Sequence, residues 1–420
     1  MKTSTASESV SAELLTPTGR ASGPAVPLIS SSLLLLCLGH FSVDFYSGAL
    51  ATLQPLLVER YSLNLSQVGT LSGVFMLGSA VCQLFFGMIS DRLPSRLFVV
   101  LGLLTAGVFL SSLGLARGYG ELLMLALVGG MGVAAFHPLS TSQVTVNAGV
   151  RRGLVMSIFI TSGMVGLSLG PTFFSFLAQW LGLDRLSLAA LPAIVVAGFL
   201  FWSLPASLNS GHQDKPPFDW EPFRRQWKPL LLQYMLVVLR SVVHLGVAQF
   251  LTIYLYTQRG FTLGQASLWL TVFFASSAVA AMIGGSIADR VGGRQVVLFS
   301  MIASVPFWAL FLATTGWPSL VGLFFGALIL LLTNPVIIVM AQELVPTQAG
   351  TASALVMGFG WGMAGITFVP MIGWLADRVG LELVLWGVIL LPLAGFLLAL
   401  KLPDHKTQAL PPALPQEIQR

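Results

Sequence analysis

The segment Gly87-Met-Ile-Ser-Asp91-Arg92-Leu-Pro-Ser-Arg96 returns as Gly285-Ser-Ile-Ala-Asp289-Arg290-Val-Gly-Gly-Arg294, 198 residues further along the chain. The glycine, the aspartate and the two arginines keep their spacing, although the residues between them differ. Each copy lies between two long apolar stretches. We interpret the repeat as an internal duplication of the chain.

The composition indicates a membrane protein. Of the 420 residues, 55% are hydrophobic and 9% are charged, whereas a soluble domain carries about 25% charged residues. A bilayer core of about 30 Å requires about 20 apolar residues per helix, and the apolar runs are too long and uniform for the strands of a barrel. The sequence predicts an all-α membrane protein with twelve transmembrane helices, at 30–58, 66–90, 95–116, 120–148, 151–180, 186–205, 229–258, 263–288, 294–314, 318–344, 348–376 and 381–401.

Further landmarks repeat at nearly the same offset, which predicts two pseudo-symmetric halves of six helices. Duplicated halves around a site at mid-membrane are the architecture of secondary transporters. We expect a disordered cytoplasmic tail at 1–28, halves at 29–205 and 229–401, a cytoplasmic linker at 206–228 and a second tail at 402–420. The repeated landmarks are Phe136-His137-Pro138 with Thr333-Asn334-Pro335, Gly163 with Gly360, and Pro171 with Pro370.

The basic residues predict the orientation of the chain. With twelve spans, 15 of the 21 Lys and Arg residues fall on the side of the two termini, five fall on the other side, and Arg240 lies within a span. The positive-inside rule then places both termini in the cytoplasm. The net charge of +5 is explained by topology, so we expect no nucleic-acid partner. Cys37 and Cys82 lie within spans, and their spacing suggests neither a metal site nor a disulfide.

The repeated Gly-x-x-x-Asp-Arg-x-x-x-Arg resembles the signature loop of the major facilitator superfamily. Within that superfamily, the sequences at 39–44 (GHFSVD), 136–138 (FHP) and 339–346 (VMAQELVP) resemble the fosmidomycin-resistance family of drug exporters. The resemblance implies the twelve-helix major facilitator fold, transport rather than enzymatic activity, and a multi-pass protein of the bacterial cytoplasmic (inner) membrane. It also implies multidrug efflux and antibiotic resistance. The acidic residue that follows His-Pro in that family is Leu139 here.

The duplicated loops have a physical role of their own. Asp91 and Asp289 end spans 2 and 8, where a carboxylate can bind an arginine or a helix N-terminus and form a latch that breaks when the halves rock. Alternatively, the arginines only enforce topology. A third copy, Gly373-Trp-Leu-Ala-Asp377-Arg378, ends span 11 on the outer side, and we expect it only to cap a helix and neutralise a charge. The predicted latch residues are Gly87, Asp91, Arg92, Arg96, Gly285, Asp289, Arg290 and Arg294.

Two pairs of ionisable residues lie within the hydrocarbon layer, where a charge costs roughly 2.5–3.5 kcal/mol. His40 and Asp44 share one face of span 1, and Asp44 is a candidate proton carrier or a structural ion pair. Arg240 and His244 form a similar pair in span 7. Arg240 stays charged and needs an anion, which we expect to be Asp44 in the empty state and a competing anionic substrate otherwise. The alternative is a permanent Arg-Asp pair.

Spans 4 and 10 each contain a polar residue followed by a proline. His137-Pro138 and Asn334-Pro335 predict two polar kinks that line one cavity. Gln342 and Glu343 lie near the cytoplasmic end of span 10, and the resemblance makes Glu343 a candidate for coupling or gating.

Span 5 carries a run of small residues that ends in a proline and resembles the glycine-proline signature of antiporters in the superfamily. Small residues at every third or fourth position allow helices to approach closely, and proline bends them. The residues expected to pack or bend helices are Gly163, Gly166, Gly170, Pro171, Pro138, Pro335 and Pro370.

The sequence favours a proton-coupled exporter, an antiporter, of a small anionic or amphiphilic drug-like compound, working by rocker-switch alternating access. The alternative is a uniporter or a proton-coupled importer of a small organic metabolite on the same scaffold. A membrane sensor or a lipid-modifying enzyme is less favoured, because the sequence has no cluster of nucleophiles or metal ligands. We expect a monomer in the lipid bilayer whose partners are protons and a small-molecule substrate, with no cofactor and no metal ion.

Overall fold

A computed structural model describes residues 31–92, 95–146, 152–206, 208 and 219–403. These residues form helices joined by short turns. The predicted tails lie outside the described residues, apart from Leu402 and Pro403, and so do residues 207 and 209–218 of the predicted linker.

The first half contains six spans, several of them built from more than one helical segment. Its segments are α1 (Ser31–Ser47), α2 (Ala49–Tyr61), α3 (Leu65–Met76), η1 (Leu77–Val81), α4 (Cys82–Arg92), α5 (Leu97–Ser111), η2 (Leu113–Leu115), α6 (Tyr119–Val146), α7 (Arg152–Leu181), η4 (Leu183–Ala189) and α8 (Ala190–Ser203).

The second half follows the short helix α9 (Glu221–Arg225) and also contains six spans. Among the described residues, eleven of the predicted spans correspond to helices that are long and apolar enough to cross a membrane, and the remaining one corresponds to the shorter apolar helix Leu97–Ser111. The segments are α10 (Trp227–Gln258), α11 (Leu263–Val291), α12 (Gly293–Ala313), α13 (Gly316–Leu331), α14 (Thr333–Leu344), η5 (Pro346–Gln348), α15 (Ala349–Ser353), η6 (Ala354–Phe359), α16 (Gly360–Met363), η7 (Ala364–Phe368), α17 (Val369–Val379), α18 (Leu381–Ile389) and α19 (Leu391–Ala399).

Equivalent spans of the two halves begin in the same way. Before α3, the Asn64 side chain accepts a hydrogen bond from the backbone N–H of Gln67, whose side chain accepts one from the backbone of Asn64. Thr262 and Gln265 form the same capping box before α11, 198 positions later. Each box satisfies two backbone donors that the first turn of a helix leaves free. The duplication thus extends to the local chemistry of helix starts.

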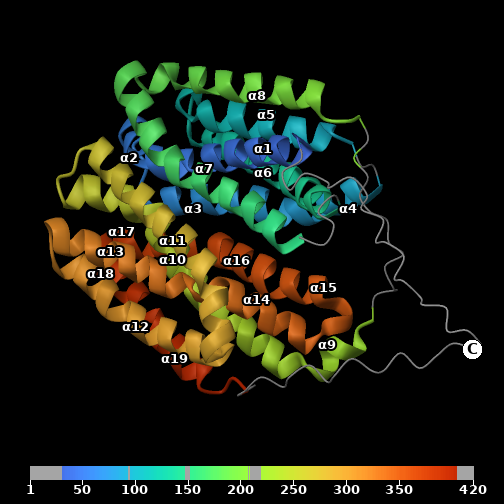
Figure 1. Cartoon of the computed structure of the whole chain (residues 1–420). Helices are drawn as coiled ribbons and strands as arrows, with labels where there is room; N and C mark the ends of the chain where they lie inside the picture. The colour runs from blue at the N-terminus through green and yellow to red at the C-terminus, as the bar shows by residue number, and fades with distance from the viewer. Residues whose placement is uncertain (1–30, 93–94, 147–151, 207, 209–218, 404–420) are drawn as a thin grey trace, which may run out of the picture.

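Figure 1 shows the two halves side by side, the first coloured blue to green and the second yellow to red. We call the end of the bundle where α2 meets α3 the Asp377 end, and the opposite end, where α9 lies, the α9 end. The halves pack closely at the Asp377 end through α3 and α17. A Cβ atom at Gly373 would lie 2.1 Å from the Leu65 carbonyl oxygen, and one at Gly69 would lie 2.7 Å from that of Val369. Only glycine allows this approach.

Asp377 fastens this contact. Its carboxylate accepts hydrogen bonds from the backbone N–H groups of Leu65 at 2.8 Å and Ser66 at 2.7 Å, and from the Ser66 hydroxyl. The negative charge thus lies at the positive N-terminal end of α3. The expectation that Asp377 only caps a helix is incomplete, because the capped helix belongs to the other half. The third copy of the motif joins the two halves.

The duplicated loops at the α9 end make different contacts from those predicted. Asp289 is exposed and has no ion pair within the described residues, and the side chain of Asp91 lies outside them. Arg96 donates to the Leu204 carbonyl at 2.7 Å, and Arg294 donates to that of Leu400 at 3.0 Å. Among the described residues, Asp289 therefore forms no ion pair with an arginine, and the predicted latch stays a prediction.

We expect Asp377→Ala to loosen the Asp377 end, because it removes the carboxylate that caps α3. Loss of a helix cap of about 1–2 kcal/mol corresponds to a shift of about 5- to 30-fold in the equilibrium between closed and open forms. Spin labels at the exposed positions Glu59 and Leu383, in a chain with both cysteines replaced, would measure the distance across this end. The matched control is Glu382→Ala, since Glu382 contacts Arg259 of its own half at 3.9 Å. An unchanged distance distribution in Asp377→Ala would contradict this role.

Candidate functional site

A cavity of about 590 Å³ lies between the halves. Its first wall includes Asp44 and His137, its second wall includes His244, Met357 and Trp361, and segments of both walls are π-helical (η1, η6 and η7). Such wide turns within α-helices are frequently found at functional sites. Two further lining residues, Gln83 and Leu84 of α4, are exposed, so the cavity opens toward the α9 end.

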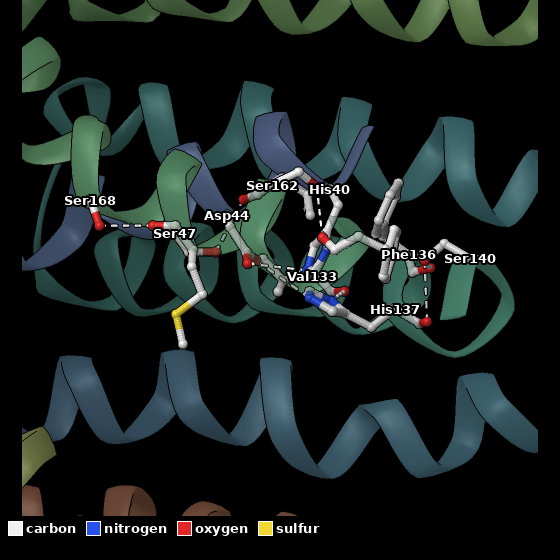
Figure 2. Close-up of polar contacts among 12 residues, drawn as sticks. His40, Asp44, Ser47, Val133, Phe136, His137, Ser140, Ser162 and Ser168 are labelled. Carbon is white, nitrogen blue, oxygen red and sulfur yellow. Dashed lines mark hydrogen bonds and ion pairs between the residues drawn. The ribbon is translucent and has the colours of Figure 1, made fainter. Parts of the chain in front are cut away.

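The first wall holds a cluster of His40, Asp44 and His137, which we call the His-Asp-His cluster (Figure 2). Asp44 Oδ2 lies 3.3 Å from His40 Nε2, and Asp44 Oδ1 lies 3.4 Å from His137 Nε2. The side chains of His40, Asp44 and His137 are 8%, 19% and 21% exposed. One carboxylate therefore bridges two histidines from α1 and α6 in a largely dry site.

The other ring nitrogens determine where the protons of the cluster lie. His40 Nδ1 is 2.8 Å from the Phe159 carbonyl oxygen, and His137 Nδ1 is 2.8 Å from that of Val133. A carbonyl oxygen only accepts, so each Nδ1 carries a hydrogen. A neutral ring would then turn the lone pair of Nε2 toward the carboxylate. Each contact to Asp44 is attractive only when a proton lies on the histidine or on the carboxyl group.

The surroundings hold the cluster in place. The ring of His40 stacks on Phe159, with centroids 4.1 Å apart, and lies near Phe136. A Cβ atom on Gly163 of α7 would lie 2.4 Å from His40 Nε2 and 2.5 Å from Asp44 Oδ2. Gly163, expected as a packing residue, therefore leaves the room that the cluster occupies.

The second wall holds Arg240 of α10, which is fully buried. Its guanidinium donates to Asn334 Oδ1 of α14 at 2.8 Å and contacts the Met357 sulfur at 3.7 Å. The predicted ion pair between Arg240 and Asp44 is not formed, because the two histidines take both oxygens of Asp44. The site thus separates a wall that carries the His-Asp-His cluster from a wall that is backed by an arginine.

The remaining candidates are divided between the cavity and the surface. His244 lines the cavity, and Asn334 reaches it indirectly by binding Arg240. Gln342 donates to Ser353 at 2.9 Å, Glu343 is exposed, and neither lines the cavity. Leu139, which replaces an acid of the resembled family, is buried in the apolar core.

The predictions missed a polar network that crosses between the halves. The Gln54 amide donates to Ser72 at 2.9 Å and to Gln249 at 3.2 Å, and Ser72 donates to Gln249 at 3.0 Å. Gln249 lies on the cavity wall. The sequence signal that could have predicted this network is the presence of two glutamines, Gln54 and Gln249, within the apolar spans 1 and 7. They lie 195 residues apart.

The cluster could also serve as a small cation site. One ligand atom from each of His40, Asp44 and His137 lies within 4.8 Å of the others. Both Nδ1 hydrogens bind backbone carbonyls, as in many metal sites. Protons shared between Asp44 and the two histidines account for the same contacts without a bound metal ion.

A duplicated twelve-helix bundle around a central cavity with ionisable walls defines a membrane transporter rather than an enzyme. The family model of the Major Facilitator Superfamily matches residues 36–264 and 244–418, and the chain belongs to this superfamily. It is 30% identical to the Fosmidomycin resistance protein of Escherichia coli over 88% of this chain and 92% of that protein. It is 26% identical to the "Probable sulfoacetate transporter SauU" of Cupriavidus necator, over 82% and 87%.

Solved structures agree on the fold. A bacterial homologue of the human lysosomal transporter Spinster, in an inward-facing and occupied conformation, superposes with a TM-score of 0.76 at 14% identity and covers 88% of this chain and 95% of that one. The all-helical fold predicted from the apolar runs, with two halves predicted from the repeat, is thus confirmed.

We expect Gly163→Ala to disturb the His-Asp-His cluster, because the new methyl group would collide with His40 and Asp44. Overpacking of this kind costs about 1–3 kcal/mol, which a lower thermal unfolding temperature of the purified protein would report. The matched control is Gly198→Ala, where a Cβ atom meets nothing within 4 Å. Equal unfolding temperatures for the two variants would mean that the cluster does not depend on Gly163.

Proposed function

We propose that this protein is a proton-coupled exporter, an antiporter, of small anionic or amphiphilic drug-like compounds. The observation that carries the proposal is the His-Asp-His cluster on the wall of the central cavity. Each contact of Asp44 with a histidine needs a proton on one of the two groups. Asp44 and His137 line the cavity, through which water reaches them. A carboxylate that gains and loses a proton as access alternates is the device that couples a proton to transport.

The proposed cycle uses the two ends of the bundle. With the α9 end in the cytoplasm, as the positive-inside rule favours, the described conformation faces inward. The substrate enters the open cavity from the cytoplasm. Release of the Asp377 contacts and closure of the duplicated loops around Asp91 and Asp289 then expose the site to the outside. Proton entry at Asp44 resets the transporter.

Two features support an anionic substrate. Arg240 supplies a permanent positive charge behind the second wall and has no carboxylate partner within the described residues. Among the relatives, one is named for resistance to fosmidomycin and another for transport of sulfoacetate, which is an anion. The apolar lining from Phe274, Phe359 and Trp361 suits an amphiphilic body.

The protein works as a monomer in this proposal, because each chain contains both halves and the complete cavity. The bacterial cytoplasmic membrane is its proposed location, with both termini inside. Multidrug efflux and antibiotic resistance follow if the cavity accepts several compounds. Uniport and proton-coupled import on the same scaffold are the competing outcomes of the test below.

We expect Asp44→Asn to abolish proton coupling, because an amide cannot carry the exchangeable proton. In proteoliposomes that contain a pH-sensitive dye, a panel of phosphonates and organic acids should drive proton movement in wild type and at least about tenfold less in Asp44→Asn. The control is Asp184→Asn, whose carboxylate is 69% exposed and lies outside the cavity. Unchanged substrate-driven proton movement in Asp44→Asn would rule out this coupling residue. Proton and substrate movement in the same direction would indicate import.

A further inference from the structure

We propose that Arg240 and His244 form the seat for the anionic group of the substrate, and that Met357 is a removable cover over this seat. The inference rests on the proposed transport of anions and deepens it by assigning the residues that bind the charge. Met357 and His244 line the cavity, whereas Arg240 lies directly behind Met357.

Arg240 has hydrogen-bonding capacity that the protein does not use. A guanidinium has five N–H donors, and within the described part of the chain Arg240 makes one hydrogen bond, to Asn334, and one weak contact, to the Met357 sulfur. Its Nε atom is buried without a partner. An unsatisfied charged donor in a dry site is costly, so Arg240 is prepared for a ligand that supplies oxygen atoms.

Arg259 follows the last residue of α10 at the Asp377 end. Its contacts show how an arginine with a structural role differs from Arg240. It donates to the Tyr254 hydroxyl from Nε at 2.8 Å, to the Thr314 carbonyl at 2.7 Å and to the Leu312 carbonyl, and Glu382 lies 3.9 Å away. The protein saturates this guanidinium with its own oxygens. Arg240 is fully buried and yet lacks such a set.

Met357 has the properties of a cover. A thioether is a weak acceptor and a flexible side chain that adopts alternative positions at low cost. Met357 lies in the π-helical segment η6, whose wide turn differs from that of an ordinary α-helix. Movement of its side chain would open a path from the cavity to the guanidinium. An anion would replace a 3.7 Å sulfur contact by a charge-assisted hydrogen bond.

His244 provides a second donor beside the arginine. It lies four residues after Arg240, on the same face of α10, and its Nδ1 atom is buried without a partner. Its ring stacks on Phe273, with centroids 4.9 Å apart, and lies 5.5 Å from the ring of Trp361. A hydrogen on Nδ1 can therefore bind an oxygen of the same anion, and the aromatic rings beside it favour a ligand with an apolar body.

The charges of the two walls favour an exogenous anion over a partner from the protein. Asp44 is the one carboxylate on the cavity wall within the described residues, and both its oxygens face histidines. Among the described residues, Arg240 is the only Lys or Arg that is buried.

Binding of phenylphosphonate to the purified full-length protein, measured by isothermal titration calorimetry, tests the seat. We expect Arg240→Gln to weaken binding at least about tenfold, because it removes a charged donor. Met357→Ala should tighten binding about three- to tenfold, because a larger fraction of the protein then presents the guanidinium. Met357→Leu should not tighten it, since leucine still covers the seat. Dimethyl phenylphosphonate, which is uncharged, should bind Met357→Ala no better than wild type.

The control variant is Met371→Ala in the same span, since Met371 is 43% exposed on the outside of the bundle and its loss should leave affinity unchanged. Equal affinity of wild type and Met357→Ala would overturn the cover, and equal affinity of wild type and Arg240→Gln would overturn the seat. The Met357 variants leave Arg240 intact, so a folding defect in Arg240→Gln cannot imitate their result. Proton coupling that depends on Asp44, together with no phenylphosphonate binding by wild type, would overturn the seat alone.

Discussion

The structure depends on how Asp44 is neutralised within the membrane. A bare carboxylate at this depth is expensive, and the protein balances it with two histidines whose outer nitrogens are fixed by backbone carbonyls. The position of the protons therefore follows from backbone geometry on α6 and α7. The absence of a side chain at Gly163 and the stacking of Phe159 on His40 both serve this arrangement.

The separation of Asp44 from Arg240 is the second organising feature. A direct pair of the two would lock the halves together, because they belong to α1 and α10. Because Asp44 and Arg240 each make their polar contacts within their own half, the walls of the cavity can move apart without breaking a buried ion pair. Polar connections between the halves include the Gln54, Ser72 and Gln249 network and the contacts of Asp377. The Asp377 hydrogen bonds are exposed, so water can replace them at low cost, whereas the glutamine network is buried.

Much of the fold could be predicted from the sequence, because lipid imposes long apolar helices and the duplication repeats their landmarks. The spans follow from the apolar runs, the halves follow from the duplication, and the pairing of His40 with Asp44 follows from their spacing along one helix. Contacts between helices could not be read in this way. Asp377 looked like a local cap, since nothing in its own span reveals that α3 of the other half begins beside it. His137 contacts Asp44, and Arg240 binds Asn334 instead of Asp44. Both contacts depend on the rotation and tilt of the helices, which packing determines. The position of Met357 beside Arg240 could not be predicted, because nothing in the sequence distinguishes one apolar residue from its neighbours in an apolar span.

The grip of Asp377 on α3 also affects how the protein tolerates mutation. Two of its three donors are backbone N–H groups, at positions 65 and 66. Side-chain substitutions there leave these donors in place, with proline as the exception. Genetic drift on the α3 side thus has little effect on the contact, whereas a change at position 377 removes all three hydrogen bonds at once. Substitutions that weaken the contact between α3 and α17 are therefore expected at position 377 of α17 rather than at positions 65 and 66 of α3.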